Sequence, residues 1–250
     1  MVIKCLNCEH SFKGKFCPNC GQDASVKRLT AGALLADILH FFTHLEKGFL
    51  LTSRLFLTKP GVSSLNYLAG KRRKYQSPVS YFLIWTGLYI ILHNSIVNYF
   101  NYQLAGEVIT QLDTSGEANI FLRNHFTFFM IPAVLCSAIS IYFTLAKPKF
   151  NFTELLALNL YGGGTYFMML FMSDFILGIV LRVNVLITPV FLWQGALSFI
   201  YNFWFSYDIF KGMHLRYFWL KLIGAAVLVA AIGWAILFYL PILWIYFMKH

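Results

Sequence analysis

The chain has 250 residues, of which 58% are hydrophobic, 18% are aromatic and only 12% are charged. A soluble domain of this length could not bury so much apolar surface, so the composition excludes an ordinary water-soluble globular protein and favours a lipid bilayer as the solvent. The formal net charge of +10 points to an anionic partner, either a membrane surface or a nucleic acid.

Four cysteines open the chain in the pattern Cys5-x2-Cys8-x8-Cys17-x2-Cys20. Each Cys-x-x-Cys pair can direct two thiolates at one ion, and two pairs complete the four sulfur ligands of a structural Zn²⁺ site, which leaves no open position for catalysis. Gly21 follows the second pair, where the backbone can turn its amides toward sulfur. Two disulfides or a redox-active pair are the alternatives. We predict a zinc-ribbon head over residues 1–25.

The head is expected to lie in the reducing cytoplasm, where zinc is favoured over disulfides. No cleavable signal peptide is visible, because the chain opens with the polar cysteine segment and its first long apolar run begins near Pro78. The fifth cysteine, Cys136, lies alone in an apolar stretch and is expected to be a small buried hydrophobe.

Residues 29–76 combine a one-sided apolar pattern with a basic segment. Between residues 29 and 57, large apolar residues recur every three or four positions, as Leu34, Ile38, Phe41, Phe42, Leu45 and Phe49. This spacing predicts an amphipathic helix lying on the cytoplasmic leaflet, with packing against the helical bundle as the alternative. The sequence Lys59-Pro60-Gly61 should end the helix and fold the chain back.

Four consecutive cations precede the first long apolar run, namely Lys71, Arg72, Arg73 and Lys74. Each cation near an anionic surface contributes about 1 kcal/mol of attraction, so we predict that this basic cluster contacts lipid headgroups. The retention of positive residues in the cytoplasm is the simpler explanation of the same residues. Nucleic-acid binding is disfavoured, because a cluster pressed against headgroups is poorly placed to follow a phosphate backbone.

Residues 77–250 contain five apolar segments that are long enough to cross about 30 Å of hydrocarbon as helices. The segments are residues 79–100, 125–146, 153–176, 185–205 and 217–247. The expected fold is therefore an all-α integral membrane protein of about five transmembrane helices, preceded by the interfacial amphipathic helix and the N-terminal zinc ribbon. Twelve of the 20 lysines and arginines precede the first segment, which predicts a cytoplasmic N-terminus and an outer C-terminus.

An ordered series of short motifs resembles a known family. The series is the two cysteine pairs, His44-x-Glu46-x-Gly48, Thr52, Pro60-Gly61, Tyr67-x-x-Gly70-Lys71-Arg72 and a proline that opens the first apolar segment. Across about residues 5–92, this order resembles a bacterial membrane family filed as domain of unknown function 3667. The resemblance implies a zinc-ribbon head followed by several spans in a bacterial inner membrane, and it assigns no biochemical activity.

Polar and small residues interrupt the apolar segments. The third segment contains a possible polar cavity, made of Asn159, Gly162, Gly163, Gly164 and Asp174. Three glycines weaken a helix by about 1 kcal/mol each, so they indicate either close helix packing or an unwound helix that lines a cavity. Asp174 could pair with Arg182, or each could reach headgroups. His93, Gln194 and Asn202 are single polar residues that we expect to hydrogen-bond between helices.

No arrangement typical of catalysis is visible. A nucleophile elbow, a phosphate-binding loop and paired catalytic carboxylates are all missing from the sequence. We therefore predict a non-enzymatic integral membrane protein, an adaptor or scaffold whose zinc ribbon presents a protein-binding head at the membrane. A channel or transporter for lipid or small solutes is the alternative, followed by a membrane-embedded enzyme. The expected partners are anionic lipid headgroups and either another protein or a second copy of the chain.

Overall fold

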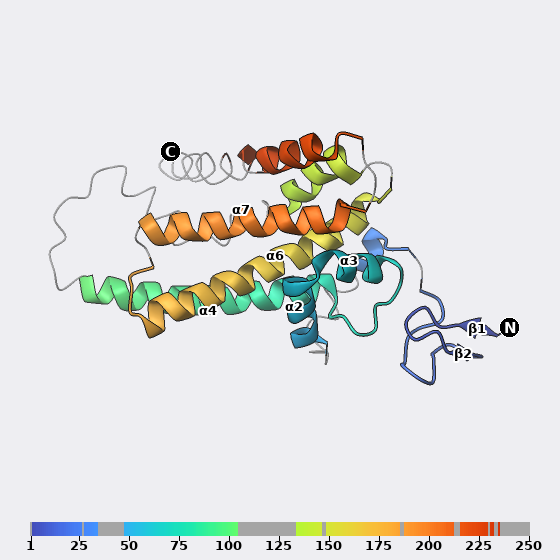
Figure 1. Ribbon diagram of the computed structural model, residues 1–250. Helices are drawn as coiled ribbons and strands as arrows, with labels where there is room; N and C mark the ends of the chain where they lie inside the picture. Colours follow the sequence, from blue (N-terminus) through green and yellow to red (C-terminus); the bar gives the residue numbers. More distant parts are fainter. Residues whose placement is uncertain are drawn as a thin grey trace, which may run out of the picture.

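The computed structural model shows a small N-terminal head at one end of an elongated bundle of helices (Figure 1). Most of the described chain is helical. The structure describes residues 2–26, 28–34, 48–104, 134–146, 149–185, 188–212, 216–229, 231–232 and 235.

The head is built on a minimal hairpin. Strand β1 (Ile3–Lys4) pairs antiparallel with β2 (Ser11–Phe12), so that Ile3 lies opposite Phe12. The side chain of Phe12 is buried with Cys5 and Cys17 in a core that is separate from the core of the bundle. So small a core needs a crosslink or a metal to be stable.

Two short helices connect the head to the bundle. Helix α2 (Phe49–Thr58) ends at Lys59, whose backbone is non-helical, and α3 (Pro60–Leu68) begins at once with proline in its first turn. The chain therefore breaks where the sequence predicts, but a second helix follows. Gly61 is required there, because a Cβ atom at this position would overlap the backbone oxygen of Asp208 in α7 (Thr188–Phe210).

Helix α2 packs against the bundle with a face that combines polar and aromatic side chains. Thr52, Ser53 and Phe56 are buried, whereas Leu50 is 74% exposed. Leu34 also belongs to the bundle core, and Phe49 stacks on Trp85 with 5.2 Å between ring centroids. At the described positions the predicted amphipathic helix thus packs on the bundle, which is the alternative to a purely interfacial helix. Ile38, Phe41, Phe42 and Leu45 lie outside the described residues.

The bundle is organised around α4 (Pro78–Leu104) and α6 (Phe152–Asp174), which lie side by side (Figure 1). A π-helical segment, η2 (Phe175–Val180), extends α6. Another, η1 (Tyr142–Ala146), follows the helix that is described from residue 134. Helix α7 packs against α3 and α6. Completely buried aromatic side chains fill the centre, namely Phe56, Tyr81, Tyr89, Tyr161, Phe167 and Phe210.

The three glycines of α6 serve close packing. A Cβ atom at Gly162 would lie 3.3 Å from the ring of Phe205, and one at Gly164 would lie 2.7 Å from the ring of Tyr81. Gly163 is similarly close to Phe82 of α4. Because α6 is a continuous helix through all three positions, the structure has the packing alternative and not the unwound helix.

Within the part of the chain that the structure describes, two helices are long and apolar enough to cross a membrane, over Pro78–Phe100 and Phe152–Val180. Shorter apolar helices cover Val134–Leu145 and Phe218–Val229. The predicted second, fourth and fifth spans fall partly outside the described residues.

Candidate metal centre and buried polar cluster

The four cysteines of the head converge on one point. The sulfur atoms of Cys5, Cys8, Cys17 and Cys20 all lie within 4.8 Å of one another, and the Cys5–Cys20 and Cys8–Cys17 sulfur pairs are each 3.6 Å apart. Four sulfurs held tetrahedrally at a zinc–sulfur distance of about 2.3 Å would be separated by about 3.8 Å. The donor set therefore fits a metal ion of this kind, and these four residues could hold it.

The two Cys-x-x-Cys turns have the same backbone hydrogen bonds. The amide of Glu9 donates to the carbonyl of Cys5, and the amide of Gly21 donates to the carbonyl of Cys17, at 2.9 and 2.8 Å. Glu9 and Gly21 both have positive φ angles, 62° and 72°. The sequence analysis expects a turn at Gly21. Glu9 occupies the equivalent position of the first turn, where its side chain makes the positive φ angle unfavourable.

The thiols of the two turns have different environments. Hydrogen bonds from the backbone of His10 and the side chain of Asn19 lower the pKa of Cys8 to about 6. Burial raises the pKa of Cys20 to about 11. Since a thiol must lose its proton to bind a metal, Cys20 should release a proton when the metal binds.

The head is attached to the bundle through Gln22, two residues after the last cysteine. Its side-chain amide donates to the carbonyl of Gly70 at 3.3 Å and accepts from the amide of Arg73 at 3.0 Å. In return, Nε of Arg73 donates to the carbonyl of Cys20 at 3.2 Å. The second cysteine turn is thus hydrogen-bonded directly to the segment 70–73, which we call the docking turn.

The docking turn begins as the C-terminal cap of α3. The amide of Gly70 donates to the carbonyl of Tyr67, and the amide of Lys71 donates to Asn66, which is the Schellman arrangement of a helix end. Gly70 has a φ of 92°, and a Cβ atom there would lie 2.9 Å from Leu6 of the head. The glycine is therefore needed both for the cap and for the approach of the head.

A second attachment fixes the linker between the head and the bundle. The guanidinium of Arg28 binds both carboxylate oxygens of Glu154, at 2.6 and 2.8 Å. Glu154 also forms a capping box with Asn151 at the start of α6, and the side chain of Asn151 donates to the carbonyl of Leu29 at 3.2 Å. No pattern in the sequence indicates this contact, because its partners are separated by more than 120 positions.

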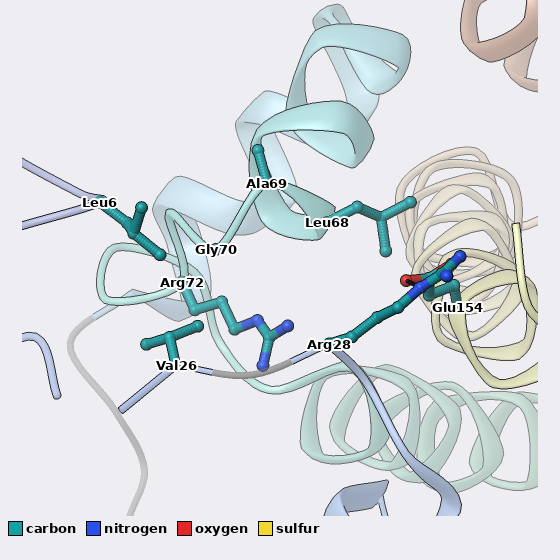
Figure 2. A pocket seen from close by; sticks show the side chains of 8 residues that line it. All are labelled: Leu6, Val26, Arg28, Leu68, Ala69, Gly70, Arg72 and Glu154. Carbon is teal, nitrogen blue, oxygen red and sulfur yellow. Dashed lines mark hydrogen bonds and ion pairs between the residues drawn. The ribbon is translucent and has the colours of Figure 1, made fainter. Parts of the chain in front are cut away.

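Between the two attachments lies an open cavity of about 270 Å³. Figure 2 shows the apolar side chains of Leu6 and Val26 on the side of the head, Leu68 on the side of α3, and Arg28 against Glu154 at one end. The side chain of Arg72 extends into the same space (Figure 2).

The predicted basic cluster is built into these contacts. Arg73 holds the head, Arg72 lies over the ring of Tyr67 at 5.4 Å, and Lys74 lies over the ring of Tyr75 at 5.1 Å. Arg73 and Lys74 are exposed. Contact between Lys71, Arg72, Arg73 or Lys74 and lipid headgroups stays a prediction.

The polar residues of the long helices form a second site. Asp174 is completely buried, and its Oδ2 lies 2.7 Å from Nδ1 of His93 on α4. Its Oδ1 accepts a hydrogen bond of 2.7 Å from Nε2 of Gln194 on α7. The expected contacts of His93 and Gln194 between helices are therefore confirmed, and the suggested pairing of Asp174 with Arg182 is wrong, since α6 passes into η2 and the chain leaves the helix at Leu181.

The other predicted cavity residues are separate from this site. Asn159 accepts a hydrogen bond from Ser137 and donates to the carbonyl of Leu155 in its own helix. Asn202, expected to bond between helices, donates to the carbonyl of Ser198 within α7.

Comparison with protein families finds one match, to the family described as "Protein of unknown function (DUF3667)", over residues 46–90. No curated protein and no solved structure matches the chain. The matched segment contains the docking turn, which binds the head, and residues that make contacts between helices of the bundle. Thr52 accepts a hydrogen bond of 2.9 Å from the amide of Gln76, Gly61 contacts Asp208, and Gly70 caps α3. Residues 46–90 of this chain are thus similar to a family whose shared segment is, here, the platform beneath the head.

Proposed function

We propose that this protein is a non-enzymatic integral membrane adaptor, whose zinc-bound head is held at the cytoplasmic end of a helical bundle and presents a binding surface to another protein. The observation that carries the proposal is the one-sided attachment of the head. Gln22 and Arg73 fix one edge on the docking turn, while Val2 and Phe16 are 60% and 56% exposed. A contiguous exposed apolar patch marks an interaction site, and the proposal is that Val2 and Phe16 belong to such a patch.

Several features support the choice of zinc. Four thiolates without an oxygen or nitrogen ligand suit Zn²⁺ in a reducing compartment. The set is closed by four protein ligands, so it favours a structural role over a catalytic one.

The membrane assignment is supported by the surface of the bundle. Large apolar side chains are exposed on several helices, as Ile91, Ile176, Val180, Leu192, Ile200, Leu220 and Val227. A surface of this kind is unfavourable in water and suits hydrocarbon. We place the chain in a bacterial inner membrane with about five spans, the head and the basic cluster inside, the C-terminus outside, and the exposed Lys74 near anionic headgroups.

Transport through the bundle is the second candidate. It is supported by the buried carboxylate of Asp174, since ionisable groups within a membrane domain commonly mark ion or proton pathways. The tight aromatic packing around Gly162 and Gly164 supports the adaptor instead, because it fills the middle of α6.

The adaptor proposal is tested by placing a photo-crosslinking amino acid at position 16 in living cells. We expect a discrete protein adduct from this position, lost when Cys8→Ser/Cys17→Ser unfolds the head. The matched control is the same amino acid at position 50, a 74% exposed leucine of α2 that should crosslink to lipid. A position 16 that yields no protein adduct, or the same adduct with an unfolded head, would contradict the proposal.

A further inference from the structure

A carboxylate without a permanently charged partner lies inside the bundle. Asp174 and His93 belong to the two helices that are long enough to cross a membrane. At 1.5 Å per residue, each lies about 10 Å from the end of its apolar stretch. Asp174 is completely buried, and the side chain of His93 is only 11% exposed.

The surroundings settle the charge of this pair. Among the described residues, Asp174 has an imidazole and an amide as its polar partners and forms no ion pair with lysine or arginine. The amide of Gln194 orients the carboxylate but cannot neutralise it. A carboxylate beside a neutral imidazole would leave an uncompensated charge in an apolar interior, which is highly unfavourable. One added proton, on either residue, removes the net charge.

The neighbouring groups do not supply that proton. Tyr89 of α4 lies beside the imidazole, with its hydroxyl 3.4 Å from Nδ1 of His93. Tyr166 of α6 also lies near Asp174, and its hydroxyl is hydrogen-bonded to Ser198 of α7. Phenols and hydroxyls are neutral near pH 7. His93 is therefore the one base in contact with Asp174 within the described parts of the chain.

An apolar cluster closes one side of the pair. It consists of Ile96, Val185 and Val190, with Leu177 packed against them. Ile96 lies about one turn beyond His93 on α4, and Val190 lies about one turn before Gln194 on α7. Gly178 allows this closure, because a Cβ atom there would lie 2.9 Å from Ile96. The pair is thus shielded from water at this end.

We propose that His93 and Asp174 form a proton-binding site inside the bundle. A hydronium ion from the solvent gives its proton to the pair, forming either an N–H bond at Nδ1 of His93 or an O–H bond at Oδ2 of Asp174, and leaves as water. The site goes beyond the adaptor function, which does not require it.

The test uses the full-length protein in detergent at about pH 8, well above the ordinary histidine pKa of about 6.5. Nitrogen-15 NMR of labelled histidines reports an imidazolium, and infrared spectroscopy reports a protonated carboxyl group. We expect one of these two signals in the wild type, and we expect Asp174→Asn to remove it. In His93→Gln the carboxyl group of Asp174, left without a base, should carry the proton itself and give the infrared signal of a protonated carboxyl group. The matched controls, His10→Gln and Asp23→Asn in the head, should keep the wild-type signal.

A wild-type protein with neither an imidazolium nor a protonated carboxyl group at this pH would overturn the proposal, whether or not the variants fold. A signal that survives in Asp174→Asn would overturn it as well. Either result would leave the adaptor proposal standing, since crosslinking from the head does not depend on this pair.

Discussion

The head and the helical bundle are stabilised in different ways. The head buries little more than Cys5, Cys17 and Phe12, whereas the bundle has a continuous aromatic core in which Phe56 stacks on Tyr161 with 4.1 Å between ring centroids. Packing of this density can hold the bundle without a ligand. The head has no comparable core, so its fold should depend on a metal.

The largest expected effect comes from removing metal ligands. Cys8→Ser/Cys17→Ser should lower the zinc content from one ion per chain to none, and should make residues 2–26 sensitive to protease, because a structural zinc contributes about 10–16 kcal/mol to a small domain. The bundle should keep its elution volume in detergent. Retained zinc, or aggregation of the whole protein, would break the distinction between the two regions.

A substitution in the bundle should lower the stability of the bundle and leave the zinc content of the head unchanged. Gly61→Ala places a methyl group against the backbone oxygen of Asp208 and should lower the stability of the bundle by about 2–3 kcal/mol. Gly87→Ala is the matched control, since nothing lies within 4 Å of its Cβ position. The control should stay within about 1 kcal/mol of the wild type. Thermal unfolding in detergent measures both, and zinc content should be unchanged in each.

The contact between the linker and the bundle should contribute less to stability than the packing at Gly61. Glu154→Gln removes the charge that binds Arg28 but keeps a side chain able to form the capping box. Because the Arg28 side chain is 62% exposed, the expected loss is only about 1 kcal/mol. Lys4→Gln, which removes the exposed ion pair with Glu9, is the control and should change stability by less than about 0.5 kcal/mol. Equal losses in the two variants would show that the Arg28 contact does not fix the linker.

The smallest expected effect is a gain in the stability of the head. Glu9→Gly relieves the positive φ angle of 62° in the first cysteine turn and should stabilise the head by about 0.5–1 kcal/mol. Gly21→Ala, at the equivalent position of the second turn, should weaken it. Competition with a zinc chelator measures both. An unchanged affinity in the two variants would mean that backbone strain does not limit this site.

The same division explains what the sequence could predict. The cysteine site is local, because its ligands fall within two short turns whose spacing is characteristic, and the helix break at Lys59 follows from Pro60 alone. The polar cluster needs His93, Asp174 and Gln194 from three helices, and nothing in their spacing shows that the helices meet there. The sequence marks each as a costly polar group, but neither alternative for Asp174, pairing with Arg182 or contact with headgroups, is what its complete burial against His93 and Gln194 shows.

The attachment of the head was harder to predict. Gln22 and Arg28 are ordinary polar residues in the sequence, and their contacts with Gly70 and Glu154 exist only after the bundle has formed. The charge of the basic cluster predicts a membrane contact. It does not indicate that Arg73 donates a hydrogen bond to the carbonyl of Cys20. The sequence shows which residues are charged, whereas the partner of each side chain is determined by the fold.

The central claim is that a metal-organised head is coupled to the docking turn and is otherwise independent of the bundle. Hydrogen exchange of the full-length protein, with and without a zinc chelator, tests this most directly. We predict that removal of the metal accelerates exchange in residues 2–26 and in the amides of Arg73 and its neighbours in the docking turn, while residues 155–170 of α6 stay protected. Unchanged exchange in the head, or a loss of protection throughout α6, would contradict the account.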